Sequence, residues 1–188
     1  MPHSRDRDAI FNRTFDLHSE AVQIYCFRRL LADDVNDAVA EVFLVAWRRI
    51  DQMPAGKELP WLYAISRNIV SNARRSGRRQ SNLREKVASL RHEDALGPET
   101  HILQTDQHRA VLEALARLST DDREVLRLKT WEELSNGDIA EVLGVSVRAI
   151  DMRISRARQR LVRAYESSEE SSRVATPVPR FVEEGGEQ

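Results

Sequence analysis

The sequence contains a single cysteine, Cys26, among 188 residues. One cysteine excludes an intramolecular disulfide, a four-cysteine zinc site and a CxxC redox motif. Because Cys26 falls within an apolar helical pattern, we expect it to be a buried structural thiol. Aromatic residues are also sparse, at 6%, but the hydrophobic fraction of 41% is sufficient for a core. The length allows one domain or two small ones.

Motifs for catalysis and membrane insertion are missing as well. The sequence contains no HExxH, P-loop, strand-following GxGxxG or serine elbow. Its five histidines are scattered, without the spacing of metal ligands. No apolar run approaches the length of a membrane span, and the charged N-terminus lacks the character of a signal peptide. We therefore expect a cytoplasmic protein that is not an enzyme, needs no cofactor or metal and does not insert into a membrane.

The charges of the chain nearly cancel, but they are segregated. Lysine plus arginine number 29 and aspartate plus glutamate number 30, so the net charge of −1 does not itself indicate a nucleic-acid partner. One basic block covers residues 67–86 and a second covers residues 147–163, whereas acids gather at 33–41, 93–106 and 121–133. Two basic blocks on an otherwise acidic chain predict two contacts with one polyanion.

Residues 134–163 predict two helices that meet at a tight corner. Ser135, followed by Asp138, is placed to cap the first helix. Gly144 stands where that helix must end in a left-handed conformation. In the second helix, three- and four-residue spacing predicts one buried stripe, formed by Val147, Ile150, Ile154, Ala157 and Leu161. The opposite face carries Arg148, Asp151, Met152, Ser155, Arg156, Gln159, Arg160 and Arg163. This pattern is typical of a helix-turn-helix, whose second helix lies in the DNA major groove.

The alternative is an ordinary helical hairpin whose arginines form a solvated face. The second helix carries six arginines against one acid, Asp151. A helix face with charges of one sign favours DNA binding over mere solubility.

The N-terminal half predicts three further helices. Apolar spacing indicates a first helix over residues 11–30, preceded by frayed residues before position 10. A second helix covers residues 35–50, with Asp34 and Asp37 as a possible capping pair at its acidic start. A third begins near Pro60 and ends in an arginine-rich run at residues 74–79.

Two asparagines in the third predicted helix lie beside a tryptophan. Asn68 and Asn72 are four residues apart, at the edge of the apolar stripe that contains Trp61. Asparagine is a poor helix former, so its presence twice suggests that these amides hydrogen-bond a base edge. The alternative is two surface asparagines without a function, and the residues alone leave it open.

The rest of the chain predicts a linker, a second domain and a tail. Residues 89–105 lose apolar periodicity and contain Gly97-Pro98, so they predict a flexible linker. Ser119 with Asp122 predicts another capped helix. Residues 166–188, rich in Ser, Glu, Pro and Gly, predict a disordered tail. The predicted fold is all-α, with small helical domains at 10–88 and 106–165, the second a helix-turn-helix.

Three segments resemble the extracytoplasmic-function (ECF) group of bacterial RNA polymerase sigma factors, in the sigma-70 family. They are DDVNDAVAEVFLVAWRRI at 33–50, LPWLYAISRNIVSNARRSGRR at 59–79, and LARLSTDDREVLRLKTWEELSNGDIAEVLGVSVRAIDMRISRARQRL at 115–161. Their order is that of the family, which retains the second and fourth sigma regions. The resemblance implies that residues 10–88 form the second-region domain and residues 106–165 the fourth-region domain.

The resemblance also implies three sets of contact residues. Those that dock on the clamp helices of the largest subunit of core RNA polymerase are Asp34, Asp37, Glu41, Val42, Phe43 and Trp47. Those that engage the minus-ten promoter element are Trp61, Asn68, Ser71, Asn72, Arg74 and Arg75. Those that recognise the minus-thirty-five element are Asp151, Met152, Ser155 and Arg156, to which the helical pattern adds Arg148 and Gln159. The chain departs from the family at Ala40, where glutamine is common, at Val35-Asn36, and at Asp151-Met152.

The expected function is therefore that of a sigma factor that directs promoter-specific transcription initiation. Its expected partners are core RNA polymerase, promoter DNA and an anti-sigma factor. One alternative is a free-standing helix-turn-helix regulator, which would bind duplex DNA without polymerase. Another is a helical adaptor whose arginines contact acidic protein surfaces, which would bind protein and no DNA.

Overall fold

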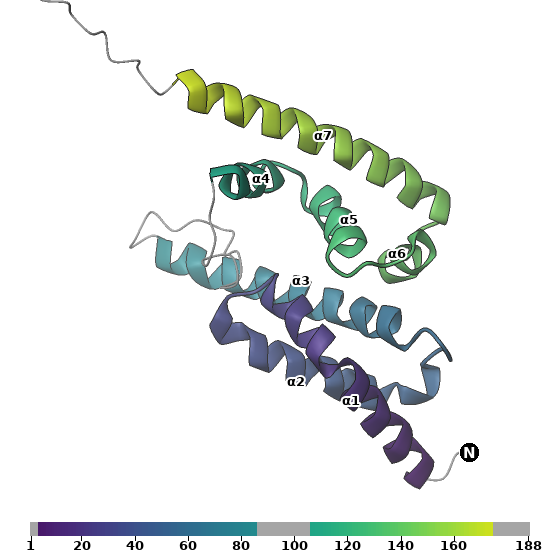
Figure 1. Cartoon of the computed structure of the whole chain (residues 1–188). Helices are drawn as coiled ribbons and strands as arrows, with labels where there is room; N and C mark the ends of the chain where they lie inside the picture. Colours follow the sequence, from purple (N-terminus) through teal and green to yellow (C-terminus); the bar gives the residue numbers. More distant parts are fainter. Residues whose placement is uncertain (1–3, 86–105, 175–188) are drawn as a thin grey trace, which may run out of the picture.

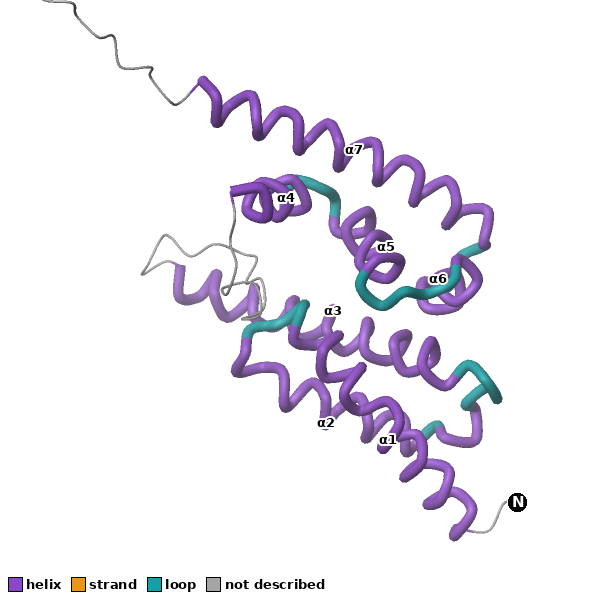
Figure 2. Tube along the Cα trace, viewed as in Figure 1, coloured by secondary structure: helices purple, strands orange, loops and turns teal. Residues whose placement is uncertain are grey.

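The computed structural model describes residues 4–85 and 106–174, and these residues contain helices but no strand (Figure 2). The elements are α1 Ser4–Phe27, α2 Ala32–Arg48, the 3-10 helix η1 Ile50–Gln52, α3 Glu58–Glu85, α4 Asp106–Ala116, α5 Thr120–Thr130, α6 Asn136–Leu143 and α7 Val147–Val174. The predicted all-α class is confirmed. The predicted linker at 89–105 lies outside the described residues.

The N-terminal lobe, which comprises α1, α2, η1 and α3, is a bundle to which each long helix contributes an apolar face. α2 packs against both α1 and α3. Val22, Val42 and Leu62, one from each helix, are fully buried, and the burial of each such side chain contributes about 1.5–3 kcal/mol. Cys26 is buried in the same core, as predicted, and burial raises the pKa of its thiol to about 11. Cys26 is therefore a structural group rather than a reactive one.

The C-terminal lobe, which comprises α4–α7, is built around the first part of α7. α4, α5 and α6 each pack on this helix. Its inward-facing side chains Ile150, Ile154 and Ala157 are buried, and Leu161 is half-buried, as the apolar spacing predicts. Val147 is exposed instead, because it is the first residue of α7 and precedes the packed part of the helix.

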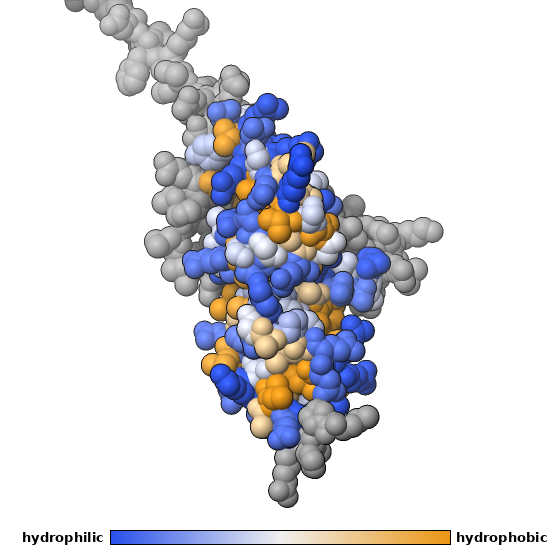
Figure 3. Space-filling view, turned by 90° about the vertical axis from the view of Figure 1, so that its right-hand side faces the viewer, coloured by the Kyte–Doolittle hydropathy of each residue, from blue (hydrophilic) through white to orange (hydrophobic). Residues whose placement is uncertain are grey.

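The two lobes lie against each other, with α3 packed on α6 (Figure 1). α6 therefore lies between α3 and α7. The face seen in Figure 3 is largely hydrophilic, with hydrophobic residues in separate patches on both halves of the molecule. The sequence predicts two domains but does not predict that they touch, because the contact is made by charged side chains far apart in the chain.

The first and last helices extend beyond their predicted ends. α1 begins at Ser4 rather than near residue 10. Arg7 holds this segment, since its guanidinium pairs with Asp51 at 2.8 Å and lies over the ring of Trp47. α7 continues through Val174, so part of the predicted disordered tail is helical. The reason is that no glycine or proline follows the corner until Pro177, and nothing else in that stretch ends a helix.

The start of α2 also differs from the prediction. Its N-cap is Leu31, which makes no side-chain capping hydrogen bond, and the helix begins at Ala32. The predicted capping pair of Asp34 and Asp37 is therefore wrong, because both residues lie inside the helix. Asp33 and Asp34 still favour this end of the helix, since carboxylates in a first turn interact well with the exposed backbone N–H groups.

Candidate nucleic-acid interface

The corner between α6 and α7 has the predicted geometry. The Ser135 hydroxyl accepts a hydrogen bond from the Asp138 backbone N–H at 3.1 Å and donates to the Asp138 carboxylate at 2.6 Å. At the other end of α6, Gly144 is left-handed, with φ 66° and ψ 37°. The Val145 N–H then donates to the Ala140 carbonyl at 3.0 Å and closes the turn. These contacts fix the direction in which α7 leaves the corner.

Beyond this corner, α7 presents its predicted DNA-contacting face to solvent. The six predicted residues are all exposed: Arg148, Asp151, Met152, Ser155, Arg156 and Gln159. They share one side of the helix, opposite the buried stripe. Among the described residues, no ion pair engages Arg148 or Arg156. Their charge is therefore available to phosphate groups.

Asp151 is held by a residue that the sequence analysis did not select. The side-chain amide of Asn136 donates to Asp151 Oδ1 at 2.6 Å. Beside this pair is a shallow hollow of about 410 Å³, lined by Asn136, Asp151, Ile154, Ser155, Arg158 and Gln159. Asn136 begins α6, and only the crossing of α6 with α7 brings it to Asp151. No local pattern identifies such a contact.

α3 carries the residues predicted to engage the minus-ten element, and most of them share one side of the helix. That side holds Trp61, Asn68, Asn72 and Arg75. Asn68, Ser71 and Asn72 are exposed, whereas Trp61 is half-buried against the core. The Arg75 guanidinium donates to Ser71 Oγ at 3.3 Å and to Asn72 Oδ1 at 3.1 Å. The structure thus joins three of the predicted residues into one exposed polar group.

Arg74 lies apart from that group. Its side chain is half-buried, and its Nε donates to the backbone carbonyl of Arg29 at 2.9 Å, where the lobes meet. Arg74 lies thirteen positions after Trp61. Because an α-helix has 3.6 residues per turn, this separation places Arg74 on the opposite side of α3 from Trp61. The structure therefore does not place Arg74 with the other predicted minus-ten residues.

α2 presents an acidic outer stripe, but two of its predicted contact residues are buried. The exposed members of the set are Asp34, Asp37 and Glu41. Val42 and Phe43 are 0% and 6% exposed, because they face the lobe core, where the Phe43 ring lies 4.7 Å from that of Phe15. In this structure these two side chains support the packing of α2 on the core, and the docking of this segment on polymerase stays a prediction. Trp47 is half-buried, edge-on to the Phe11 ring at 5.2 Å.

A second charged site lies where the lobes meet, and the sequence analysis did not identify it. The side chain of Arg29 is 1% exposed and pairs with Glu124 at 3.0 Å and with Glu132 at 2.8 Å. The Tyr25 hydroxyl donates to Glu124 at 2.9 Å. Tyr25 and Arg29 belong to the N-terminal lobe, and the two glutamates belong to the C-terminal lobe. We call these four residues the interlobe network.

The charges of this network are mutually stabilised. Burial opposes the ionisation of Glu124, but the charge of Arg29 and hydrogen bonds from Arg29 and Tyr25 outweigh it and lower the pKa of Glu124. Burial also disfavours the Arg29 cation, yet Tyr25 and the two glutamates keep the pKa of Arg29 raised. Arg127 is packed nearby, and burial together with the charge of Arg29 lowers its pKa to about 10. Arg29 and Glu124 are therefore both charged at neutral pH.

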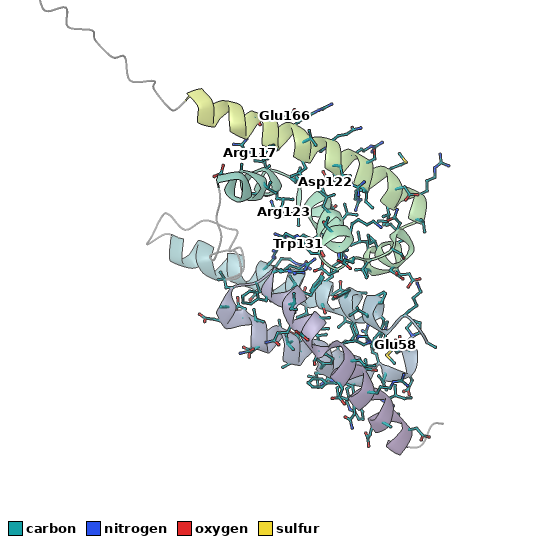
Figure 4. The ribbon with its side chains drawn as sticks, viewed as in Figure 1. Glu58, Arg117, Asp122, Arg123, Trp131 and Glu166 are labelled. Carbon is teal, nitrogen blue, oxygen red and sulfur yellow. The ribbon has the colours of Figure 1, made fainter. Side chains whose placement is uncertain are left out.

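Two further contacts join the lobes. Trp131, at the end of α5, lies between that helix and α3 (Figure 4). The Arg28 guanidinium lies 5.4 Å from the centre of its ring, within range of a cation–π interaction. Lys57, just before α3, pairs with Asp138 and lies 3.6 Å from Glu141. The hydrogen bond from Lys57 lowers the pKa of Asp138.

Within the described part of the chain, no three His, Cys, Asp or Glu side chains are grouped to hold a metal ion. None of the described helices combines the length and apolar character that a membrane crossing requires.

Comparison with known proteins places this geometry in a family. A family model described as sigma-70, region 4 matches residues 108–161, which include the helix-turn-helix. The ECF RNA polymerase sigma-E factor of Haemophilus influenzae is 30% identical over 160 residues, which cover 79% of this chain and 84% of that protein. The chain belongs to the ECF RNA polymerase sigma factors. This sigma factor is thus similar to its relative over most of both sequences.

Two other proteins define the extent of the likeness. The probable RNA polymerase sigma factor RfaY of Xanthomonas campestris pv. campestris is 35% identical over 128 residues, but the match covers 65% of this chain and 32% of RfaY. The chain therefore spans about a third of that relative. The sigma factor RpoE of Bartonella quintana, solved in complex with the anti-sigma factor NepR, superposes with a TM-score of 0.65 and 26% identity. That match covers 83% of this sigma factor and 96% of RpoE.

Proposed function

We propose that this sigma factor binds core RNA polymerase and directs it to promoters whose minus-ten and minus-thirty-five elements contact separate lobes. The observation that carries the proposal is the outer face of α7, where all six predicted residues are exposed beyond a helix-turn-helix corner. In this proposal Arg148 contacts phosphate, so promoter affinity falls as salt rises. Met152, Ser155 and Arg156 contact base edges in the major groove.

The N-terminal lobe supplies the other contacts. Asp34, Asp37 and Glu41, with Trp47 beside them, dock on the clamp helices of the largest polymerase subunit. Asn68 and Asn72, next to Trp61, capture a flipped-out base of the non-template strand, while Ser71 and Arg75 hold the adjoining backbone. Extruding a base costs a few kcal/mol, and stacking on an aromatic ring returns about 1–3 kcal/mol per base.

Asp151 gives the minus-thirty-five contact a chemical preference. A carboxylate in the major groove accepts a hydrogen bond from the N4 amino group of cytosine. Asn136 holds Oδ1 of Asp151 and leaves Oδ2 as the acceptor. We therefore include Asn136 in the proposed site as a positioning residue and expect cytosine at one position of the element.

The remaining parts of the proposal concern partners and location. The sigma factor carries out no catalysis of its own and needs no cofactor, because polymerase supplies the chemistry. It acts in the cytoplasm, and an anti-sigma factor restrains it. This last point rests on the likeness to RpoE, which was solved with such a partner.

The test is run-off transcription with purified core polymerase on a library of promoter sequences. We expect the full chain to select a set of promoters with shared minus-ten and minus-thirty-five elements. Arg156→Ala should weaken use of the upstream element by roughly 1–3 kcal/mol, the value of one base contact. Arg163→Ala, also an exposed arginine of α7, is the matched control and should have a smaller effect. Failure of the unaltered protein to produce any promoter-specific transcript contradicts the proposal.

A further inference from the structure

The corner between α6 and α7 carries two exposed valines that the proposed DNA contacts do not use. Val145 is 38% exposed and Val147 is 48% exposed. They flank Ser146, at the start of the helix that lies in the major groove. A single exposed valine needs no explanation, but two at this position form an apolar surface where the helix enters the groove. We call Val145 and Val147 the apolar tip.

The polar groups of the corner are engaged within the protein. The Val145 N–H donates to the Ala140 carbonyl at 3.0 Å. The Ser146 hydroxyl accepts a hydrogen bond from the Ala149 N–H at 3.2 Å and so caps α7. Residues 143–147 contain no charged side chain. What the corner offers to a partner is therefore mainly the two valine side chains.

The apolar tip is continuous with the proposed DNA-contacting face of α7. Arg148 directly follows the tip, and Asp151 lies one helical turn further along; both are exposed. The space around the corner is open, because a Cβ atom placed on Gly144 would meet no heavy atom within 4 Å. Base edges in the major groove present one apolar group, the C5 methyl of thymine. The chemistry of the tip thus matches that methyl group.

We propose that Val145 and Val147 contact the C5 methyl of a thymine and so specify thymine at one position of the minus-thirty-five element. This inference rests on the proposed function, because it assigns a base to the same recognition helix. Val147 and Asp151 are four residues apart, so they share one side of α7 and are separated by about 6 Å along its axis. That distance is about two base-pair steps of about 3.4 Å. The thymine therefore lies within about two base pairs of the cytosine that Asp151 contacts.

The experiment removes the methyl group from the DNA rather than a side chain from the protein. It uses the full chain bound to core polymerase and a promoter selected in the transcription assay. Each thymine of the minus-thirty-five element, on either strand, is replaced in turn by deoxyuridine, which lacks only the C5 methyl. Competition between the two promoters measures their relative affinity. One replacement should lower the affinity about fourfold, the effect of exposing one buried methyl group.

Variants then assign this loss to the tip. The same replacement should have no effect in Val147→Ala, because the shorter side chain does not reach the methyl group, and a smaller effect than fourfold in Val145→Ala. Val162→Ala is the matched control, since Val162 is also an exposed valine of α7 but lies fifteen positions beyond Val147. It should keep the fourfold loss. Unchanged helical circular dichroism checks that each variant folds.

Three results overturn the thymine contact. The first is unchanged affinity after every deoxyuridine replacement, which requires no variant. The second is a fourfold loss that persists in Val147→Ala. The third is a Val147→Ala protein that uses every promoter equally less well, with or without the methyl group, because the tip then contacts polymerase instead of DNA. Failure of the unaltered protein to select any promoter contradicts the proposed function instead.

Discussion

Asp151 illustrates how a single residue on a basic helix can acquire a specific role. An isolated carboxylate on a DNA-contacting face would repel phosphate. Here the Asn136 amide holds one oxygen at 2.6 Å and orients the carboxylate. The same acid that weakens non-specific attraction thus becomes an acceptor for one base. Sequence analysis selected Asp151 from its position on the helix but did not identify Asn136, because the two residues meet only through the crossing of α6 and α7.

We predict that Asn136→Ala lowers the preference for cytosine at one position of the minus-thirty-five element. The expected loss is about 1 kcal/mol, roughly fivefold in relative promoter use, as for one hydrogen bond. Asp151→Ala should remove the preference entirely. The measurement is competitive transcription from promoters that differ at single upstream positions. Asn12→Ala, which changes an exposed asparagine of α1, serves as the control, and an unchanged base preference in Asp151→Ala would rule out the assigned contact.

At the scale of the helix-turn-helix, the two glycines of this region, Gly137 and Gly144, have different backbone conformations. Gly144 ends α6 at a φ of 66°, a conformation that residues with a Cβ rarely adopt. Gly137 lies inside α6, and a Cβ there would meet Ser135 Oγ at 3.6 Å, an ordinary contact. Of the two positions, only 144 has a backbone conformation that requires glycine.

This difference predicts opposite effects of the same substitution. Gly144→Ala should destabilise the protein by about 1–2 kcal/mol through backbone strain alone, since the added methyl meets nothing within 4 Å. Gly137→Ala should be neutral or stabilise by up to about 1 kcal/mol, because alanine favours a helix interior. Urea-induced unfolding followed by circular dichroism measures both. Equal effects of the two substitutions would show that the corner does not depend on the left-handed residue.

The elements that could be predicted are those set by local sequence. Apolar spacing predicted the buried stripe of α7, and capping residues predicted the starts of α5 and α6, where Ser119 and Ser135 accept the expected hydrogen bonds. Val42 and Phe43 belong to the apolar spacing of the second predicted helix and are buried, although the family resemblance also placed them in a contact set, because a family motif marks a segment and does not say which side of α2 faces the core. The start of α1 was missed for a similar reason, since Arg7 is held by Asp51, a residue distant in sequence.

At the scale of the whole molecule, the main unexpected feature is that the lobes touch. Arg29 and its glutamate partners are 95 or more positions apart in the chain, and no periodicity links them. The charge pattern placed Glu124 and Glu132 in the acidic stretch at 121–133, but Arg29 lies outside both basic blocks and was not selected. The contact is nevertheless specific, because Arg29 is bound by two carboxylates and its backbone carbonyl accepts from Arg74.

The contact between the lobes should weaken in acid. The pKa of Glu124 is lowered in the structure, since the charge of Arg29 and the hydrogen bonds from Arg29 and Tyr25 outweigh its burial, and Arg127 adds a further positive charge. Its contribution is therefore complete above the ordinary value of 4.5 and is lost as the pH falls through the lowered pKa. We predict that the distance between spin labels attached to introduced cysteines, one on each lobe, lengthens below that range, and less steeply in Glu124→Gln. Lengthening on raising the pH from neutrality instead would contradict this linkage.

The central claim is that one chain engages core polymerase and both promoter elements together. The most direct measurement is a footprint on a promoter selected in the transcription assay, combined with permanganate probing of unpaired thymines. With polymerase and the full chain present, we expect protection over both elements and reactive thymines at the minus-ten element, and neither with the sigma factor alone. A footprint that is confined to the upstream element and is the same with or without polymerase would contradict the claim and identify a free-standing regulator.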